Sequence, residues 1–195
     1  MSLNFASPDT WVLGIDDTDM PGIGGTGQLA RRLSAEIERR GIGRADGVTR
    51  HQFFEGPGVP KTSRNSAAAV AVSGVTSPDH LFATAAEMVS AEAVAGSDPG
   101  VAMGNMSLDL ALLEFARSAQ SGLVTQADAR QLAAAHAVDL IGLGGTNGGV
   151  IGALGNLMEA PGDGSRISGV WTDVNYYGAY LASMITLAVA CAIAA

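Results

Sequence analysis

The alternation of apolar and polar stretches along the chain predicts a mixture of strands and helices. Short apolar runs are typical of buried strands, and they occur at 10–15, 48–54, 67–72 and 138–142. A turn at 97–101 leads into a further short strand. Apolar residues at three- and four-residue spacing are typical of helices that bury one face, and they predict helices at 27–40, from 78, from 107, at 125–137 and from 150. The order indicates an α/β fold: a mixed sheet with helices packed on it, including an antiparallel pair within 48–72.

Capping residues support the ends of these helices. Thr26 is the expected N-cap of the first helix, and Gly41 follows its last turn. Ser77 precedes Pro78, which is the preferred order at a helix start. Ser107 is the expected cap of a later helix, and Thr125 with Asp128 resembles a capping box.

Two units in which a strand, a glycine-rich loop and a helix follow one another are the main functional signal. In the first, the strand ends at Asp16, Asp17 and Asp19, and the loop contains Gly24, Gly25, Thr26 and Gly27. Carboxylates suit a hard cation such as Mg²⁺, which takes oxygen ligands, and free N–H groups at a helix start suit an anion. The alternative is a solvated acidic loop with an ordinary helix cap.

The second unit contains Gly144, Gly145, Thr146, Asn147 and Gly148 before the helix at 150. It has neither the Gly-Lys-Ser/Thr of a P-loop nor the spacing of a dinucleotide fingerprint. Between the two units, Lys61 and Arg64 are candidates for a phosphate clamp. A surface turn with ordinary charges is the alternative reading of this pair.

Composition limits the classes of partner. The net charge is −8 and there is no basic run, so we do not expect the lone chain to bind nucleic acid through its phosphates. The single Cys191 excludes an intrachain disulfide and a cysteine zinc site. No signal peptide is recognisable, and the cytoplasm is the default location. We expect one domain over 1–195.

The C-terminal stretch carries no charge from Val174 to Ala195. A buried or subunit-interface helix is the favoured interpretation, because the stretch is rich in alanine and lacks a basic flank; a membrane anchor is the alternative. A homodimer would cover this apolar surface.

Four segments, in order, resemble the N-terminal domain of the TiaS family, the archaeal tRNA agmatidine synthetases. They cover roughly residues 11–160; residues 161–195 have no counterpart in the family. The segments are Gly14–Asp19 with Thr26 and Leu29-Ala30, Pro60–Ala67, Asp98–Val101, and Gly148–Leu154. Gly25 and Gly27 stand where the family has Cys and a second Thr, and Arg64 is displaced by one position.

The resemblance implies an ATP-binding, kinase-like domain. In the family this domain phosphorylates a cytidine carbonyl so that agmatine can displace the phosphate, its aspartates handle metal-bound triphosphate, and it phosphorylates its own Thr at the position of Thr26. The family's ferredoxin-like, OB-fold and zinc-ribbon parts have no counterpart here, so the tRNA and agmatine functions are not carried over.

The sequence therefore predicts a Mg-ATP-dependent phosphotransferase, or an ATP-activating enzyme, that acts on a small-molecule acceptor. Asp16, Asp17 and Asp19 would hold Mg²⁺, Lys61 would neutralise the transferred phosphate, and the glycine loops with Asn65 would bind ATP. Thr26 is either a phosphoacceptor or only the helix cap. A non-catalytic nucleotide sensor, and an RNA-modification component that needs a partner chain, are the alternatives.

Overall fold

The computed structural model describes residues 9–59, 64–105 and 109–157. In chain order, the elements in these ranges are β1 (Trp11–Asp16), α1 (Thr26–Arg39), β2 (Arg44–Gln52), β3 (Ser66–Ser73), α2 (Pro78–Glu92), β4 (Gly100–Asn105), α3 (Leu110–Ser121), α4 (Gln126–Ala135), β5 (Asp139–Gly142) and α5 (Val150–Gly155). The predicted α/β class and both glycine-rich strand–loop–helix units are confirmed.

The strands form one five-stranded sheet in the order β2-β3-β1-β4-β5. Each neighbouring pair is antiparallel, so the sheet is antiparallel throughout rather than mixed. The predicted antiparallel pair within 48–72 corresponds to β2 and β3. The predicted run at 48–54 is shifted, because β2 ends at Gln52 and leaves Phe53 and Phe54 beyond the strand.

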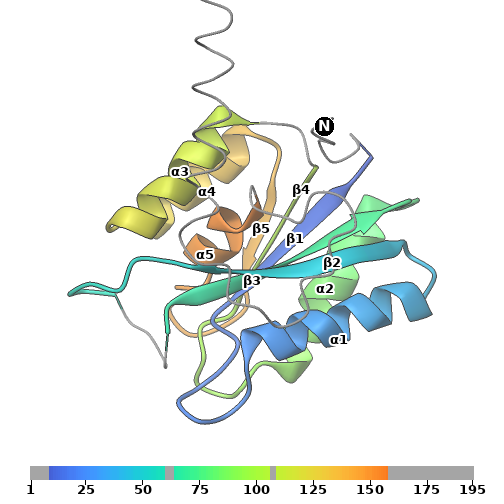
Figure 1. The fold of residues 1–195 in the computed structure, drawn as a ribbon, viewed down its shortest axis with the longest axis horizontal. Helices are drawn as coiled ribbons and strands as arrows, with labels where there is room; N and C mark the ends of the chain where they lie inside the picture. Colours follow the sequence, from blue (N-terminus) through green and yellow to red (C-terminus); the bar gives the residue numbers. More distant parts are fainter. Residues whose placement is uncertain (1–8, 60–63, 106–108, 158–195) are drawn as a thin grey trace, which may run out of the picture.

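Helices cover both faces of the sheet (Figure 1). The first face carries α1 and α2, and its core includes Leu13, Ile15 and Val70 from the strands. The second face carries α5, with α3 and α4 packed against it. Alternate strand residues point to opposite faces, so Val12, Ala69 and Ala102 belong to the second core. The strands thus present smaller side chains to the face that α5 covers.

Glycines allow α5 to lie very close to the sheet. A Cβ added at Gly14 would lie 2.0 Å from the carbonyl oxygen of Ala153, and one added at Gly100 would lie 2.3 Å from the carbonyl carbon of Gly149. Any side chain at these positions would push the helix away. Close packing of α5 therefore requires glycine in β1 and β4.

Most of the predicted helix ends are confirmed. Ser77 caps α2 through the amide of His80, and Thr125 with Asp128 forms a capping box on α4. Gly41 has a φ of 67°, and the amide of Ile42 donates to the carbonyl of Ile37 over 3.1 Å. This is the hydrogen bond of a Schellman motif, which needs a left-handed residue after the helix.

Two predicted caps differ from the structure. Gly25, not Thr26, is the N-cap of α1, and it makes no side-chain capping bond. Thr26 is the first helical residue instead, and its hydroxyl accepts a hydrogen bond from Thr18. Asp109 caps α3 through the amides of Ala111 and Leu112; the predicted cap Ser107 lies outside the described residues.

Some sequence predictions lie outside the described residues, namely those for Lys61, Cys191 and the uncharged stretch at 174–195. Among the residues that are described, no helix is both long and apolar enough to cross a membrane.

The close packing of α5 makes Gly14→Ala a sensitive test of the fold. We expect it to lower the free energy of unfolding by about 3 kcal/mol, because an added methyl group in a tightly packed core forces the backbone apart. Urea denaturation measures the change.

Gly104→Ala in the neighbouring strand is the matched control. Its added Cβ would meet only side chains, at 3.4 Å and 3.5 Å, and we expect its stability to stay within about 1 kcal/mol of the parent. Equal losses in the two variants would contradict the close approach of α5.

Candidate functional site

The antiparallel pairing brings five chain segments to one edge of the sheet. Asp16 pairs with Gly100, and Gly100 pairs with Gly142, so these three residues lie in one row at that edge. On the other side of β1, Gln52 pairs with Ser66. Five strand ends, with the loops attached to them, consequently meet at this edge. They are the C-terminal ends of β1, β2 and β5 and the N-terminal ends of β3 and β4.

A cavity of about 230 Å³ lies among these loops. One wall is acidic and contains Asp16, Asp17, Asp19 and Asp98, together with Thr26, Thr146 and Gly148. The opposite wall contains Arg50, Phe53, Phe54, Arg64, Asn65 and Ser66. An apolar third wall comes from the end of α3 and the loop after it, with Ala119, Leu123 and Val124.

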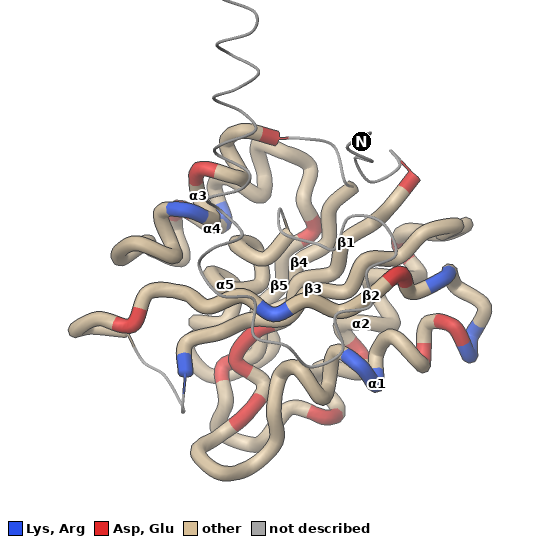
Figure 2. The backbone as a smooth tube through the Cα atoms, viewed as in Figure 1, with Lys and Arg blue, Asp and Glu red and all other residues tan. Residues whose placement is uncertain are grey.

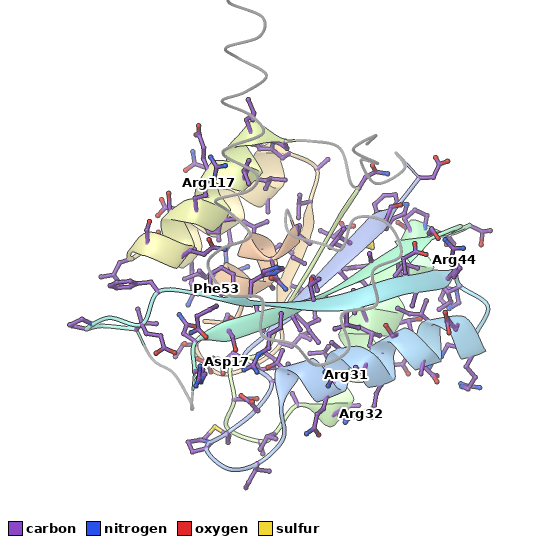
Figure 3. The ribbon with its side chains drawn as sticks, in the orientation of Figure 1. Asp17, Arg31, Arg32, Arg44, Phe53 and Arg117 are labelled. Atoms are coloured by element: carbon purple, nitrogen blue, oxygen red, sulfur yellow. The ribbon has the colours of Figure 1, made fainter. Side chains whose placement is uncertain are left out.

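Figures 2 and 3 show where the charged residues and the cavity residues lie relative to the sheet. Acidic segments gather below the sheet edge where β1 ends (Figure 2). In Figure 3, Asp17 and Phe53 lie on the same side of the molecule, near the end of β1, whereas Arg44 lies at the opposite end of the sheet. Acidic segments also lie elsewhere on the chain, and the four aspartates of the cavity are one close group among them.

Asp16 is the most strongly perturbed carboxyl group of the acidic wall. Its side chain lies against α5, and a Cβ on Gly152 would be 2.1 Å from its Oδ2 atom. Burial, and then the charges of Asp17 and Asp19, raise its pKa to about 7, although the Asp17 amide acts in the opposite direction. Burial and like charges both disfavour the ionised form. A bound cation would therefore stabilise the ionised form of this carboxyl group.

Asp17 has a left-handed backbone with a φ of 52°, which is uncommon for a residue other than glycine. Burial and the neighbouring charges of Asp98 and Asp19 raise its pKa, and a hydrogen bond from the Asp98 amide partly opposes the rise. The unusual backbone turns the chain at the end of β1 and brings this carboxylate to Asp98.

The three predicted magnesium ligands do not form a ready-made site. Among the described residues, no group of three acidic, histidine or cysteine side chains has the spacing of a metal centre. Mg²⁺ often takes only one or two carboxylates and completes its shell with water and substrate phosphates. The acidic wall fits that second type of site better than an all-protein cage.

The loop after β5 is tied to Asp98. The amide of Thr146 donates to Asp98 Oδ1 over 2.9 Å, its hydroxyl donates to Asp98 Oδ2, and the amide of Gly149 donates to the Asp98 carbonyl over 2.9 Å. The Asn147 amide donates to Gly144. The amides of Gly144, Gly145 and Gly148 donate to no described residue, so only part of this loop can offer N–H groups to a ligand.

The loop after β1 ends at the N-terminus of α1. Thr18 Oγ1 donates to Thr26 Oγ1 over 3.1 Å, and both threonines are buried. The amides of Thr26 and Gly27 donate to no described residue, and Thr26 lines the cavity. The start of this 14-residue helix thus lies at the cavity, with N–H groups that donate to no described residue.

The opposite wall is held by hydrogen bonds at the base of the β2–β3 connection. Asn65 Nδ2 donates to the Phe54 carbonyl over 2.8 Å, and Gln52 Nε2 donates to Glu55 Oε1 over 2.8 Å. Arg50 donates twice to the hydroxyl of Ser66. The amide nitrogen of Asn65 is therefore occupied in fixing this connection.

The structure brings together about half of the predicted site residues. Asp16, Asp17, Asp19, Thr26, Asn65, Thr146 and Gly148 line the cavity. Gly24, Gly25, Gly27, Gly144, Gly145 and Asn147 shape the two loops without lining it, and Lys61 lies outside the described residues.

Sequence reasoning did not assign Phe53, Phe54, Asp98 or Arg50 to the site, although all four line the cavity. The sequence indicated only that Asp98 belongs to a turn before β4. Its proximity to Asp17 follows from the antiparallel order of β1 and β4, which the apolar pattern does not specify.

The fold has similar counterparts among solved structures, although no model of a protein family and no curated protein matches the sequence. A complex of TiaS with tRNA and ATP matches with a TM-score of 0.68 and 24% identity, and a tRNA fluorescent labeling enzyme with 0.67 and 25%. A complex of TiaS with tRNA, AMPCPP and agmatine matches with 0.65 and 23% identity.

The match covers 76% of this chain in each case, and the chain spans 36% of the length of each of these proteins. The fold is TiaS-like. The family resemblance predicted from four sequence segments is thereby confirmed, and it concerns one part of those proteins rather than the whole.

The pKa of Asp16 predicts how stability depends on pH in the protein treated with a chelator. The folded state holds a proton on Asp16 up to about pH 7, whereas the unfolded chain loses it near pH 4. The folded state therefore binds more protons between these values, and the free energy of unfolding should fall as pH rises from about 4 to 7.

Asp16→Asn removes the part of this dependence that Asp16 contributes, while the raised pKa of Asp17 still acts in the same direction. Because one pKa unit corresponds to about 1.4 kcal/mol, we expect the variant to be about 2–4 kcal/mol more stable than the parent at pH 8 and nearly equal to it at pH 4, as measured by urea denaturation. Asp139→Asn, at the exposed start of β5, should keep the parent's pH profile. An Asp16→Asn profile parallel to the parent's would contradict the burial of this charge.

Proposed function

We propose that this chain binds Mg-ATP in the cavity at the end of β1 and uses it to phosphorylate, or otherwise activate, an acceptor. The observation that carries the proposal is the convergence of four carboxylates and the start of α1 on one cavity. This arrangement occurs in a fold shared with TiaS, which was solved with ATP. Neither glycine loop alone would support it.

The carboxylates fit a divalent cation because they are crowded together. Asp16 and Asp17 both have raised pKa values, partly through neighbouring carboxylates, including Asp19 and Asp98. A cation would relieve this repulsion. We assign Asp17 and Asp19 to the metal, with Asp16 behind them at the base of the cavity; the bound ion would supply charge neutralisation for the phosphates.

The phosphates would meet backbone N–H groups on the same wall. The amides of Thr26 and Gly27 lie at the start of a long helix, where N–H groups and the helix dipole favour anions. The Gly148 amide offers a further donor. Lys61 retains the predicted role of neutralising the transferred phosphate, and Arg64 follows it three residues later in the sequence.

The remaining walls suit the acceptor or the base of the nucleotide. Phe54 provides aromatic surface beside the buried Phe53, and Leu123 and Val124 add apolar surface at the rim. Flat, partly apolar groups bind well to such walls, while the charged groups remain at the acidic end. We expect a small organic acceptor with a hydroxyl or carbonyl oxygen as the reacting group.

A nucleoside of an RNA is the second candidate for the acceptor. The observation that favours it is that the matched structures include TiaS with a bound tRNA and an enzyme that labels tRNA. The charge of −8 argues that the affinity for RNA would come mainly from another polypeptide segment or chain.

ATP turnover distinguishes catalysis from mere sensing of the nucleotide. A catalytic chain should release ADP faster with an acceptor present, and comparing tRNA with small nucleosides would identify the acceptor class. A non-catalytic sensor, which the glycines at 25 and 27 favour, should bind ATP without turnover.

Calorimetric titration with a non-hydrolysable ATP analogue tests the proposed site directly. We expect binding that strengthens at least 10-fold when Mg²⁺ is added, because the ion screens the phosphates from the carboxylates. Asp17→Asn should abolish the Mg²⁺-dependent gain.

Glu114→Gln, an exposed substitution on α3 with the same change of charge, is the control and should bind as the parent does. Absence of binding by the parent at millimolar ligand, or an Asp17→Asn variant that responds fully to Mg²⁺, would refute the proposal.

A further inference from the structure

We propose that Asp98 is a positioning residue, which fixes the loop at 143–149 against Asp17 so that both face the same phosphates. This inference rests on the proposed function. It assigns a role to a residue that the metal and the nucleotide need not touch.

Asp98 makes hydrogen bonds both to the loop after β5 and to Asp17 at the end of β1. Its carboxylate and its carbonyl oxygen hold Thr146 and Gly149 of the loop, while its amide donates to the Asp17 carboxylate. The next residue continues the attachment, because the amide of Leu143 donates to the Pro99 carbonyl over 2.8 Å. Asp98 is thus the direct link between the end of β1 and the loop that follows β5.

The surrounding glycines make this close link possible. A Cβ at Gly145, where φ is 54°, would lie 1.3 Å from Asp98 Oδ1. A Cβ at Gly149 would lie 2.5 Å from the Asp98 carbonyl oxygen and 2.9 Å from that of Asp16. The loop can therefore approach Asp98 this closely only because it lacks side chains there.

The contact between Asp98 and the loop brings Gly148 close to the carboxylates of Asp98 and Asp17. The position of a Cβ on Gly148 lies 3.5 Å from Asp98 Oδ2 and 3.9 Å from Asp17 Oδ2. The amide of Gly148 donates to no described residue. A phosphate oxygen near Gly148 would consequently lie beside an ion held by Asp17.

A carboxylate at position 98 has an electrostatic cost, because it repels the nearby carboxylate of Asp17. Its charge is one of the causes that raise the pKa of Asp17. However, two oxygens are needed to accept from both the amide and the hydroxyl of Thr146, and an asparagine would present an NH₂ group to one of these donors. The carboxylate is therefore suited to holding Thr146, despite the repulsion from Asp17.

Thr146 also extends the link to α4, because Gln126 Nε2 donates to the Thr146 carbonyl over 2.9 Å. The loop is thereby held at its middle from two directions. Loss of the Asp98 contact should loosen 144–148 without disturbing α1, which lies on the opposite face of the sheet.

The test uses the full chain and four variants: Asp98→Asn, Thr146→Val, Thr146→Ser and the exposed control Asp139→Asn. Two quantities are measured, namely the affinity for a Mg²⁺-loaded non-hydrolysable ATP analogue and hydrogen exchange of the hydrogen-bonded loop amides of Thr146, Asn147 and Gly149 and of the amides in α1. We expect at least 10-fold weaker binding and at least 10-fold faster exchange of the loop amides in Asp98→Asn and Thr146→Val.

Thr146→Ser keeps both donors and should restore affinity and protection to within about threefold of the parent. Exchange in α1 should stay unchanged in all four variants, which a general loss of stability would not allow.

Binding and loop protection equal to the parent's in Asp98→Asn and Thr146→Val would overturn the positioning role, as would a Thr146→Ser variant as impaired as Thr146→Val. If the parent itself binds no nucleotide, the proposed function fails. The exchange data then still decide whether Asp98 holds the loop.

Discussion

The close contact between α5 and the sheet is the constraint on which the rest of the site depends. Glycine at positions 14 and 100 allows the helix to approach, and glycine at 149 and 152 lets the chain pass directly over Asp16. This approach buries the Asp16 carboxyl group and brings the loop after β5 to Asp98. A larger residue at any of these positions would separate the two glycine-rich units.

The same packing creates an electrostatic cost. Four aspartates line one wall of the cavity, and burial combined with mutual repulsion raises the pKa of Asp16 to about 7 and raises that of Asp17 as well. A fold selected for stability alone would avoid this crowding. Perturbed carboxyl groups in a cavity are typical of sites that bind a cation or act on a substrate. In the proposed Mg-ATP site, the bound cation would relieve the repulsion between the carboxylates, and this relief would favour binding.

The sequence predicted the elements better than their arrangement. The three- and four-residue spacing of apolar residues was enough to place α1, and the acidic cluster with its glycine loop identified one wall of the cavity. Asp98, Phe53 and Phe54 were not recognised, because their place in the cavity depends on strand order and direction. Thr26 was predicted as a helix cap, but a hydrogen bond from Thr18, eight residues away, occupies its hydroxyl; propensity rules do not include such tertiary contacts.

Nucleotide and metal should bind together where the ends of β1 and β5 meet. Paramagnetic broadening of backbone amide signals by Mn²⁺, added with a non-hydrolysable ATP analogue, measures this directly. We expect broadening of the amides at 16–19, at 26–27, at 98 and at 144–148, with little effect at the far end of the sheet near Arg44. Broadening centred elsewhere, or broadening that does not require the nucleotide analogue and is spread over the acidic surface, would contradict a shared site for nucleotide and metal.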